Sequence, residues 1–135
     1  MKVSAKGRYA LIMMADIASL SSSKSVSLKD IANRREISLK YAEQIASALT
    51  KKSLLISARG PQGGYTLVKS AEDYSVMEII KAVDGDFAIV PNLAEHAKRE
   101  ENDLTHSFWE NISSDIAAKL TNTSLLDVVR LGCVN

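Results

Sequence analysis

Two helical patterns separated by a very short turn constrain the fold of this chain more than any other feature. Residues 27–30 have the sequence SLKD, the spacing of a capping box, in which a serine oxygen and a carboxylate bind free N–H groups at a helix start. That helix is expected to end near residues 34–36. Ser38 then predicts the N-cap of a second helix. This second helix places apolar residues at the spacing i, i+3, i+4 and i+7, at Ala42, Ile45, Ala46 and Leu49. The short connection favours a helix-turn-helix.

Elements on both sides narrow the fold class. Residues 8–20 are expected to form a preceding helix, with apolar side chains at helical spacing at Leu11, Met14, Ala15 and Ala18. After the helical pair, apolar segments at 54–59 and 65–68 flank the loop GPQGG at 60–64, which predicts a β-hairpin. We therefore expect a mainly α-helical protein with a small β-hairpin, arranged as a winged helix-turn-helix.

The C-terminal half adds a long amphipathic helix between two shorter ones. Residues 75–78, SVME, form a further predicted capping box that opens a helix closed by Gly85. A helix from Asp103 to about Thr121 carries a regular apolar seam, and a short helix follows it. The seam consists of Trp109, Ile112, Ile116 and Leu120. Such a seam needs a partner surface, which is the core of the monomer, the interface of a dimer, or both.

Composition excludes several classes of protein. The 135 residues suit one domain, and 46% hydrophobic with 24% charged residues is an ordinary globular composition. The apolar segment at 10–15 ends before Asp16 and is too short to span a bilayer. The basic start of the sequence lacks the features of a signal peptide. We therefore expect a cytoplasmic protein. With Cys133 as the single cysteine, an internal disulfide is impossible. No catalytic triad, paired carboxylates or cofactor fingerprint is recognisable, so an enzyme is not expected.

Charge is distributed very unevenly along the chain. Residues 1–70 contain 12 lysines and arginines against 4 acidic residues, whereas residues 71–135 contain 5 against 12. A basic half attracts polyanions, because a polyanion releases counterions when it binds. The uneven charge therefore favours nucleic acid as a partner, although solubility alone remains the alternative.

The outward face of the second helix of the pair carries side chains that can bind bases. Once the apolar positions are removed, the residues left are Lys40, Tyr41, Glu43, Gln44 and Ser47. Glutamine pairs with adenine, lysine donates to guanine or phosphate, and glutamate accepts from the cytosine amino group. The alternative is a solvated helix face with no ligand.

The hairpin loop is the second candidate contact. Its glycines are expected to permit positive φ angles and close backbone approach, and Arg59 stands beside them. An arginine at such a tip can enter a narrow minor groove. A phosphate-binding enzyme loop is disfavoured, because a strand and not a helix follows the glycines. A purely structural turn remains the alternative.

Several segments together resemble a known bacterial family. They are MKVSAKGRYA at 1–10, ISLKYAEQ at 37–44, RGPQGGY at 59–65, LTHSFW at 104–109 and TSLL at 123–126. The chain resembles the Rrf-type regulators, which include the iron-sulfur cluster regulator, the nitric oxide sensor and the cysteine metabolism repressor. The resemblance implies a winged-helix transcriptional regulator, more often a repressor. It acts as a homodimer formed through the long helix, on a partly palindromic double-stranded DNA operator.

The resemblance also assigns parts and residues. It implies a DNA-binding winged helix-turn-helix domain at 1–85, a variable loop at 86–102 that reads a signal in relatives, and a dimerisation helix with a C-terminal helix at 103–135. The base-reading helix falls on residues 38–47, with Glu43 as a specificity element, and the minor-groove arginine falls on Arg59. The phosphate-contacting segment runs from Ser4 to Arg8 and includes Lys6.

The cluster-binding members of the family place three cysteines before the dimerisation helix. This chain has no cysteine between Gly85 and Leu104, and Asp103 stands at the last of those places. We therefore expect no cofactor and no iron-sulfur cluster, because such clusters need thiolates. His96, His106, Glu95 and Asp103 suggest a metal site only weakly, because their spacing matches no metal-binding signature.

Two other functions remain open at this stage. One is a protein-interaction module of the cysteine metabolism repressor type, with a metabolic enzyme as its partner. The other is a metal or cluster sensor with unusual ligands. Cys133, near the end of the sequence, also leaves a redox role open.

Overall fold

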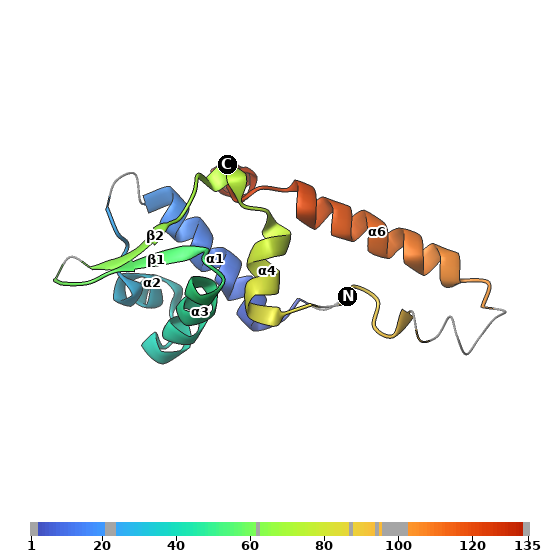
Figure 1. The fold of residues 1–135 in the computed structure, drawn as a ribbon, viewed down its shortest axis with the longest axis horizontal. Coiled ribbons are helices and arrows are strands. Elements are labelled where there is room, and N and C mark those ends of the chain that lie inside the picture. Colours follow the sequence, from blue (N-terminus) through green and yellow to red (C-terminus); the bar gives the residue numbers. More distant parts are fainter. Residues whose placement is uncertain are drawn as a thin grey trace.

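The computed structural model describes residues 3–20, 24–61, 63–86, 88–93, 95 and 103–133. In chain order the elements are α1 (Ala5–Leu20), α2 (Leu28–Arg35), α3 (Leu39–Lys51), β1 (Leu55–Ala58), β2 (Gly64–Leu67), the 3-10 turn η1 (Ala71–Asp73), α4 (Val76–Asp84), α6 (His106–Asn122) and α7 (Leu125–Gly132). Figure 1 shows the first three helices, the hairpin, α4 and α7 gathered in one body, from which α6 extends. Much of the predicted variable loop, including His96, lies outside the described residues.

Helix α1 begins earlier than predicted and buries a different face. It starts at Ala5 rather than at residue 8, because the Ser4 hydroxyl accepts a hydrogen bond from the Gly7 backbone N–H at 2.9 Å and so caps the helix. Its fully buried hydrophobic residues are Ala10, Met13, Met14 and Ile17. Of the predicted inward positions only Met14 is fully buried, while Leu11, Ala15 and Ala18 are partly buried at the edge of the core.

The helical pair forms where predicted, although at residues 27–30 the structure shows only the serine half of the expected capping box. Ser27 accepts a hydrogen bond from the Asp30 backbone N–H at 3.4 Å, and Ser38 accepts one from the Tyr41 N–H at 3.0 Å, so both helices start at the expected serines. Between them Glu36 has φ of 55°, a left-handed conformation that ends α2 and turns the chain toward α3. All of the predicted inward residues of α3 are buried: Ala42, Ile45, Ala46 and Leu49.

The hairpin forms an antiparallel ladder in which Leu55 pairs with Leu67 and Ala58 with Gly64. Its loop therefore covers residues 59–63, one residue earlier than predicted. Of its glycines, Gly60 alone adopts positive φ, at 104°. Gly64 is required for another reason, since a Cβ there would collide with the backbone of Val26. Val26 and Tyr65 exchange backbone hydrogen bonds of 2.9 Å, which fasten the hairpin to the segment before α2.

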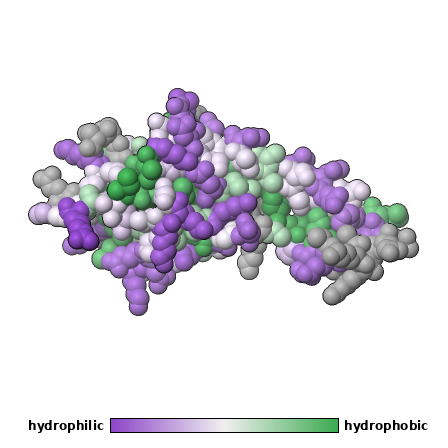
Figure 2. Space-filling view, in the orientation of Figure 1, coloured by the Kyte–Doolittle hydropathy of each residue, from purple (hydrophilic) through white to green (hydrophobic). Residues whose placement is uncertain are grey.

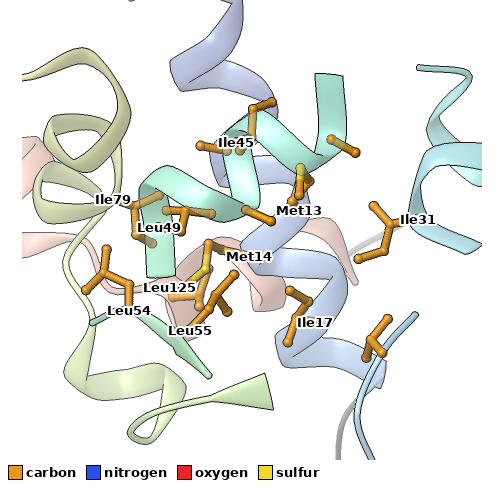
Figure 3. Packing of buried hydrophobic residues seen from close by; sticks show 14 of the residues in the cluster. Met13, Met14, Ile17, Ile31, Ile45, Leu49, Leu54, Leu55, Ile79 and Leu125 are labelled. Atoms are coloured by element: carbon orange, nitrogen blue, oxygen red, sulfur yellow. The ribbon is translucent and has the colours of Figure 1, made fainter. Parts of the chain in front are cut away.

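The core lies where α1, α3, α4, α7 and the hairpin meet (Figure 3). Met14 of α1 packs in one cluster with Leu49 of α3, Ile79 of α4 and Leu125 of α7. Tyr74 belongs to the same cluster, and its hydroxyl donates to the Leu54 carbonyl at 2.8 Å. These contacts fix the hairpin and α3 on one rigid support.

Helices α6 and α7 have well-defined starts. Helix α6 begins at His106 rather than at residue 103, because the Asp103 carboxylate accepts from the Thr105 N–H at 2.9 Å in the turn before it. A complete capping box between Ser124 and Asp127 opens α7, a signal that the sequence analysis passed over. Among the described residues, no helix combines the length and the apolar character needed to cross a membrane.

Candidate nucleic-acid interface

The face of α3 opposite the core is solvent-exposed and polar. Lys40, Glu43, Gln44 and Ser47 are all exposed, as is Ser38 at the start of the helix. The side chains proposed from the sequence as base readers therefore lie on the accessible side of the second helix of the pair. That is the side a helix-turn-helix presents to a major groove.

A shallow depression joins this face to the start of α1 and to α4. It is lined by Lys6 of α1, by Ala82 of α4, and by Lys40, Glu43, Gln44, Ser47, Ala48, Lys51 and Lys52 of α3 and its C-terminal cap. We call it the α3 groove. Four lysines lie around it against one glutamate, so it favours an anion.

Lys51 and Lys52 were not identified from the sequence as site residues. They follow the last apolar residue of α3, Leu49, and their position beside Lys6 depends on the packing of α1 across α3. In the sequence, the adjacent pair Lys51 and Lys52 was the only indication that these residues belong to the site. In the folded chain this run extends the positive edge of the α3 groove.

Tyr41 and Arg8 lie at the border of this site rather than in it. The ring of Tyr41 is half-buried and meets the Tyr9 ring edge-on, with centroids 5.9 Å apart. The Arg8 guanidinium carbon lies 5.8 Å from the same Tyr9 ring centroid. Arg8 lines a different depression, between α1 and α7, together with Asp16 and Arg35. The structure therefore does not bring Arg8 into the α3 groove.

Ser4 is engaged inside the protein. Its hydroxyl accepts from the Gly7 N–H and donates to a carboxylate oxygen of Asp84 at the end of α4. Both functions of the hydroxyl are thus satisfied internally. The family resemblance implies a phosphate contact for Ser4, and in the structure the Ser4 side chain holds the start of α1.

Arg59 lies directly after β1, at the start of the hairpin loop, and is exposed. The left-handed Gly60 follows it and turns the chain. At the next glycine of the loop, Gly63, a Cβ would collide with the Ala58 carbonyl, so only glycine keeps the loop this narrow. The hairpin therefore presents an arginine at a slender tip.

An ion pair between a buried carboxylate and a half-exposed arginine, which no sequence pattern predicted, supports the helix-turn-helix. Asp16 of α1 is 6% exposed and accepts a hydrogen bond from Arg35 Nε of α2 at 2.9 Å, and a second Arg35 nitrogen binds its other oxygen. Hydrogen bonding to Asp16 raises the pKa of Arg35. The pair joins α2 to α1 across 19 positions of sequence. At that separation, no local sequence pattern predicts the contact.

The apolar seam of α6 is not part of the monomer core. None of its residues is fully buried: Ile112, Ile116 and Leu120 are half-buried and Trp109 is 42% exposed. The neighbouring Phe108 is 55% exposed and its ring contacts the Trp109 ring edge-on, with centroids 4.9 Å apart. Hydrophobic surface along α6 is visible in Figure 2. The seam therefore leaves apolar surface uncovered in the protomer, and its role in a dimer interface stays a prediction.

The residues present do not fit an iron-sulfur cluster. The sequence has one cysteine, Cys133, which is exposed at the C-terminal cap of α7. His106 Nε2 lies 3.0 Å from Glu110 Oε1 within α6, and Asp103 bonds to Thr105. Across the described ranges, no group of three histidine, cysteine or acidic side chains is arranged to hold a metal ion.

The fold and the site together define a winged helix-turn-helix protein of the transcription-regulator class. The features that define it are the helix pair, the β1–β2 hairpin with its narrow loop, which forms the wing, and the lysine-lined α3 groove. Residues 3–131 match the Rrf2 family, described as iron-dependent transcriptional regulators. The chain belongs to this family, so the resemblance seen in the sequence and the expected fold class are both confirmed.

Individual relatives agree with this assignment. The HTH-type transcriptional regulator IscR of Serratia proteamaculans is 40% identical over 130 residues, which cover 96% of this chain and 79% of the relative. A putative HTH-type transcriptional regulator of Haemophilus influenzae is 41% identical, covering 96% and 87%. The solved structure of CymR, the global cysteine regulator of B. subtilis, superposes with a TM-score of 0.82 at 32% identity, covering 97% of this chain and 98% of that one.

Proposed function

We propose that this protein is a transcriptional repressor that acts in the cytoplasm as a homodimer and binds a partly palindromic operator. The observation that carries the proposal is the α3 groove, where exposed base-reading side chains and several lysines gather around one helix. Membership of a family of transcriptional regulators supports it. In a dimer, two such helices would enter successive major grooves.

Each side chain has a distinct role in this proposal. Gln44 and Lys40 bind base edges, and Glu43 discriminates among bases by accepting from a cytosine amino group. Lys6, Lys51 and Lys52 bind phosphates along the edge of the α3 groove. Arg59 enters the adjacent minor groove, whose negative potential attracts a guanidinium. Ser47 and Tyr41 flank the base readers.

The dimer forms through α6. This helix extends from the body of the protomer (Figure 1). Its Phe108 and Trp109 are exposed, and a second copy can bury the same face, as two-fold symmetry requires. Adjacent exposed aromatic rings are typical anchors of such interfaces. The proposal therefore assigns α6 to self-association and α3 to DNA.

The experiment is a selection of genomic fragments bound by the purified protein, followed by duplex binding at increasing salt. We expect recovery of promoter fragments that contain an imperfect palindrome, and affinity that falls steeply as salt rises. A random duplex of equal length is the control and should bind more weakly at every salt concentration. Failure to bind any promoter fragment at low salt would contradict the proposal.

We further propose that DNA binding needs no iron-sulfur cluster. A cluster requires several thiolates, and a dimer of this chain supplies only the two copies of Cys133. Anaerobic reconstitution with iron and sulfide, followed by assays of both and a visible spectrum, is expected to give no cluster. Near-stoichiometric iron and sulfide that are lost on mutation of Asp103 or His106 would overturn this proposal.

A further inference from the structure

The start of α1 is fixed by a contact with the far end of α4. The Ser4 hydroxyl donates to Oδ1 of Asp84, the last residue of α4, and the same hydroxyl accepts from the Gly7 N–H at 2.9 Å. Ser4 and Asp84 are 80 positions apart in sequence, so this contact depends on the fold. Figure 1 shows the start of α1 and the end of α4 side by side.

Gly7 allows the two helices to meet this closely. A Cβ at Gly7 would lie 2.6 Å from Oδ2 of Asp84 and 3.4 Å from Cγ2 of Ile80. Any larger residue would therefore displace the Asp84 carboxylate from its place beside the start of α1. Ser4, Gly7 and Asp84 form one arrangement, which we call the α1–α4 clasp.

The clasp holds the turn of α1 that carries Lys6. Lys6 lies between Ser4 and Gly7 in sequence, and its side chain lines the α3 groove together with Ala82, which precedes Asp84 by two residues on α4. The position of Lys6 relative to the base-reading residues of α3 thus depends on how the start of α1 sits on the end of α4.

We infer that Asp84 is a positioning residue for DNA binding, which acts through Ser4 to hold Lys6 at a phosphate. The inference rests on the proposed DNA contact of the α3 groove. According to this inference, the acidic residue Asp84 favours DNA binding, although its negative charge lies near a negatively charged ligand. By charge alone, removal of the Asp84 carboxylate would strengthen binding to DNA by reducing repulsion.

Two substitutions separate these effects. Asp84→Asn and Asp84→Ala remove the same charge, but asparagine retains an oxygen that accepts from the Ser4 hydroxyl and alanine does not. The difference between the two variants therefore measures the hydrogen bond, without any difference in net charge. Ser4→Ala removes the same bond from the other side.

The readout is the slope of log affinity against log salt for an operator duplex recovered with the wild-type protein. Each phosphate contact contributes about 0.9 to this slope. We expect Asp84→Ala and Ser4→Ala each to reduce the magnitude of the slope by about 0.9, the value of one phosphate contact, as Lys6→Ala should. Both variants should also bind the operator roughly two- to tenfold more weakly than Asp84→Asn. In the Asp84→Ala background, the further substitution Lys6→Ala should then cause little additional change in the salt slope. A change that only lowered the fraction of folded protein would leave the slope unaltered.

The matched control is Ser124→Ala, which removes a serine N-cap that also neighbours an aspartate, but at the start of α7. It should leave the salt slope as in the wild type. The inference is overturned if Asp84→Ala and Asp84→Asn have equal slopes and affinities, or if Lys6→Ala leaves the slope unchanged. If the wild-type protein binds no duplex, the proposed function itself fails, and that outcome is distinguishable because it precedes any variant.

Discussion

At the scale of single residues, the exposed side chains around α3 divide into those that can distinguish bases and those that can only neutralise phosphate. Gln44 and Glu43 have directional donors or acceptors, whereas Lys6 and Lys51 carry a charge on a flexible stem. Arg59 combines both properties, because its guanidinium is charged and planar. Substitutions at these positions should therefore have different signatures.

We expect Arg59→Ala to weaken binding to the operator by about 1–3 kcal/mol, with a smaller effect on random duplex. Lys6→Ala should weaken both duplexes alike, and Glu43→Ala should narrow the gap between them because it removes a discriminating acceptor. Titrations of both duplexes at one salt concentration measure these effects. Lys119→Ala, on the exposed side of α6, is the control. Equal losses on both duplexes for all three variants would contradict this division of roles.

The ion pair between α1 and α2 makes an asymmetric prediction. Asp16 is almost fully buried, while the Arg35 side chain is 44% exposed. Arg35→Ala leaves the buried Asp16 carboxylate without its bidentate partner, and the Arg34 guanidinium, 4.0 Å away, replaces it poorly. Asp16→Asn instead leaves an arginine whose side chain is hydrated. We expect Arg35→Ala to reduce the free energy of unfolding by about 1–3 kcal/mol and Asp16→Asn to reduce it less. Urea denaturation of both variants checks the order, and the reverse order would show that solvent already compensates Asp16.

At the scale of elements, the sequence predicts α3 well and α1 less well. In α3 polar residues separate the apolar ones, so periodicity identifies Ala42, Ile45, Ala46 and Leu49 as the inner face. In α1 residues 10–15 are all apolar, so local pattern does not select a face, and packing against α3 and α4 decides which residues are buried. The Asp16–Arg35 pair and the α1–α4 clasp join residues 19 and 80 positions apart, so no local pattern signals either contact.

The capping box of α7 predicts a dependence on pH. Backbone and side-chain hydrogen bonds from Ser124 hold the pKa of Asp127 below its ordinary value of 3.8. Because this pKa is lowered on folding, the carboxylate stabilises the folded protein above about pH 4 and loses this effect as the pH falls through the lowered pKa. The difference in unfolding free energy between the wild type and Asp127→Asn should therefore be present at pH 7 and shrink in acid. Asp115→Asn on α6 is the control, and a difference independent of pH would refute the assignment.

At the scale of the whole molecule, the uneven charge of the sequence corresponds to two separate surfaces. The basic half of the chain forms the α3 groove and the wing, and the acidic half contains α6, which extends from the body (Figure 1). Self-association through the acidic half would leave the basic surfaces of both copies free for one polyanion. The separation also keeps the lysines of one copy away from those of the other, which lowers their mutual repulsion.

This arrangement predicts that dimer formation and DNA binding fail together when the apolar face of α6 is reduced. Trp109→Ala removes a partly exposed ring that contacts Phe108, so it should leave the fold of the body intact. We expect the dimer dissociation constant to rise by tenfold or more, since loss of an aromatic anchor typically costs about 2 kcal/mol. Sedimentation equilibrium at micromolar concentration measures it, and operator affinity should fall with it because one protomer contacts only a half-site. Leu131→Ala is the matched control, since it shortens an exposed apolar residue on α7 rather than on α6. A monomeric wild type that still bound the operator with full affinity would show instead that each protomer reads DNA alone.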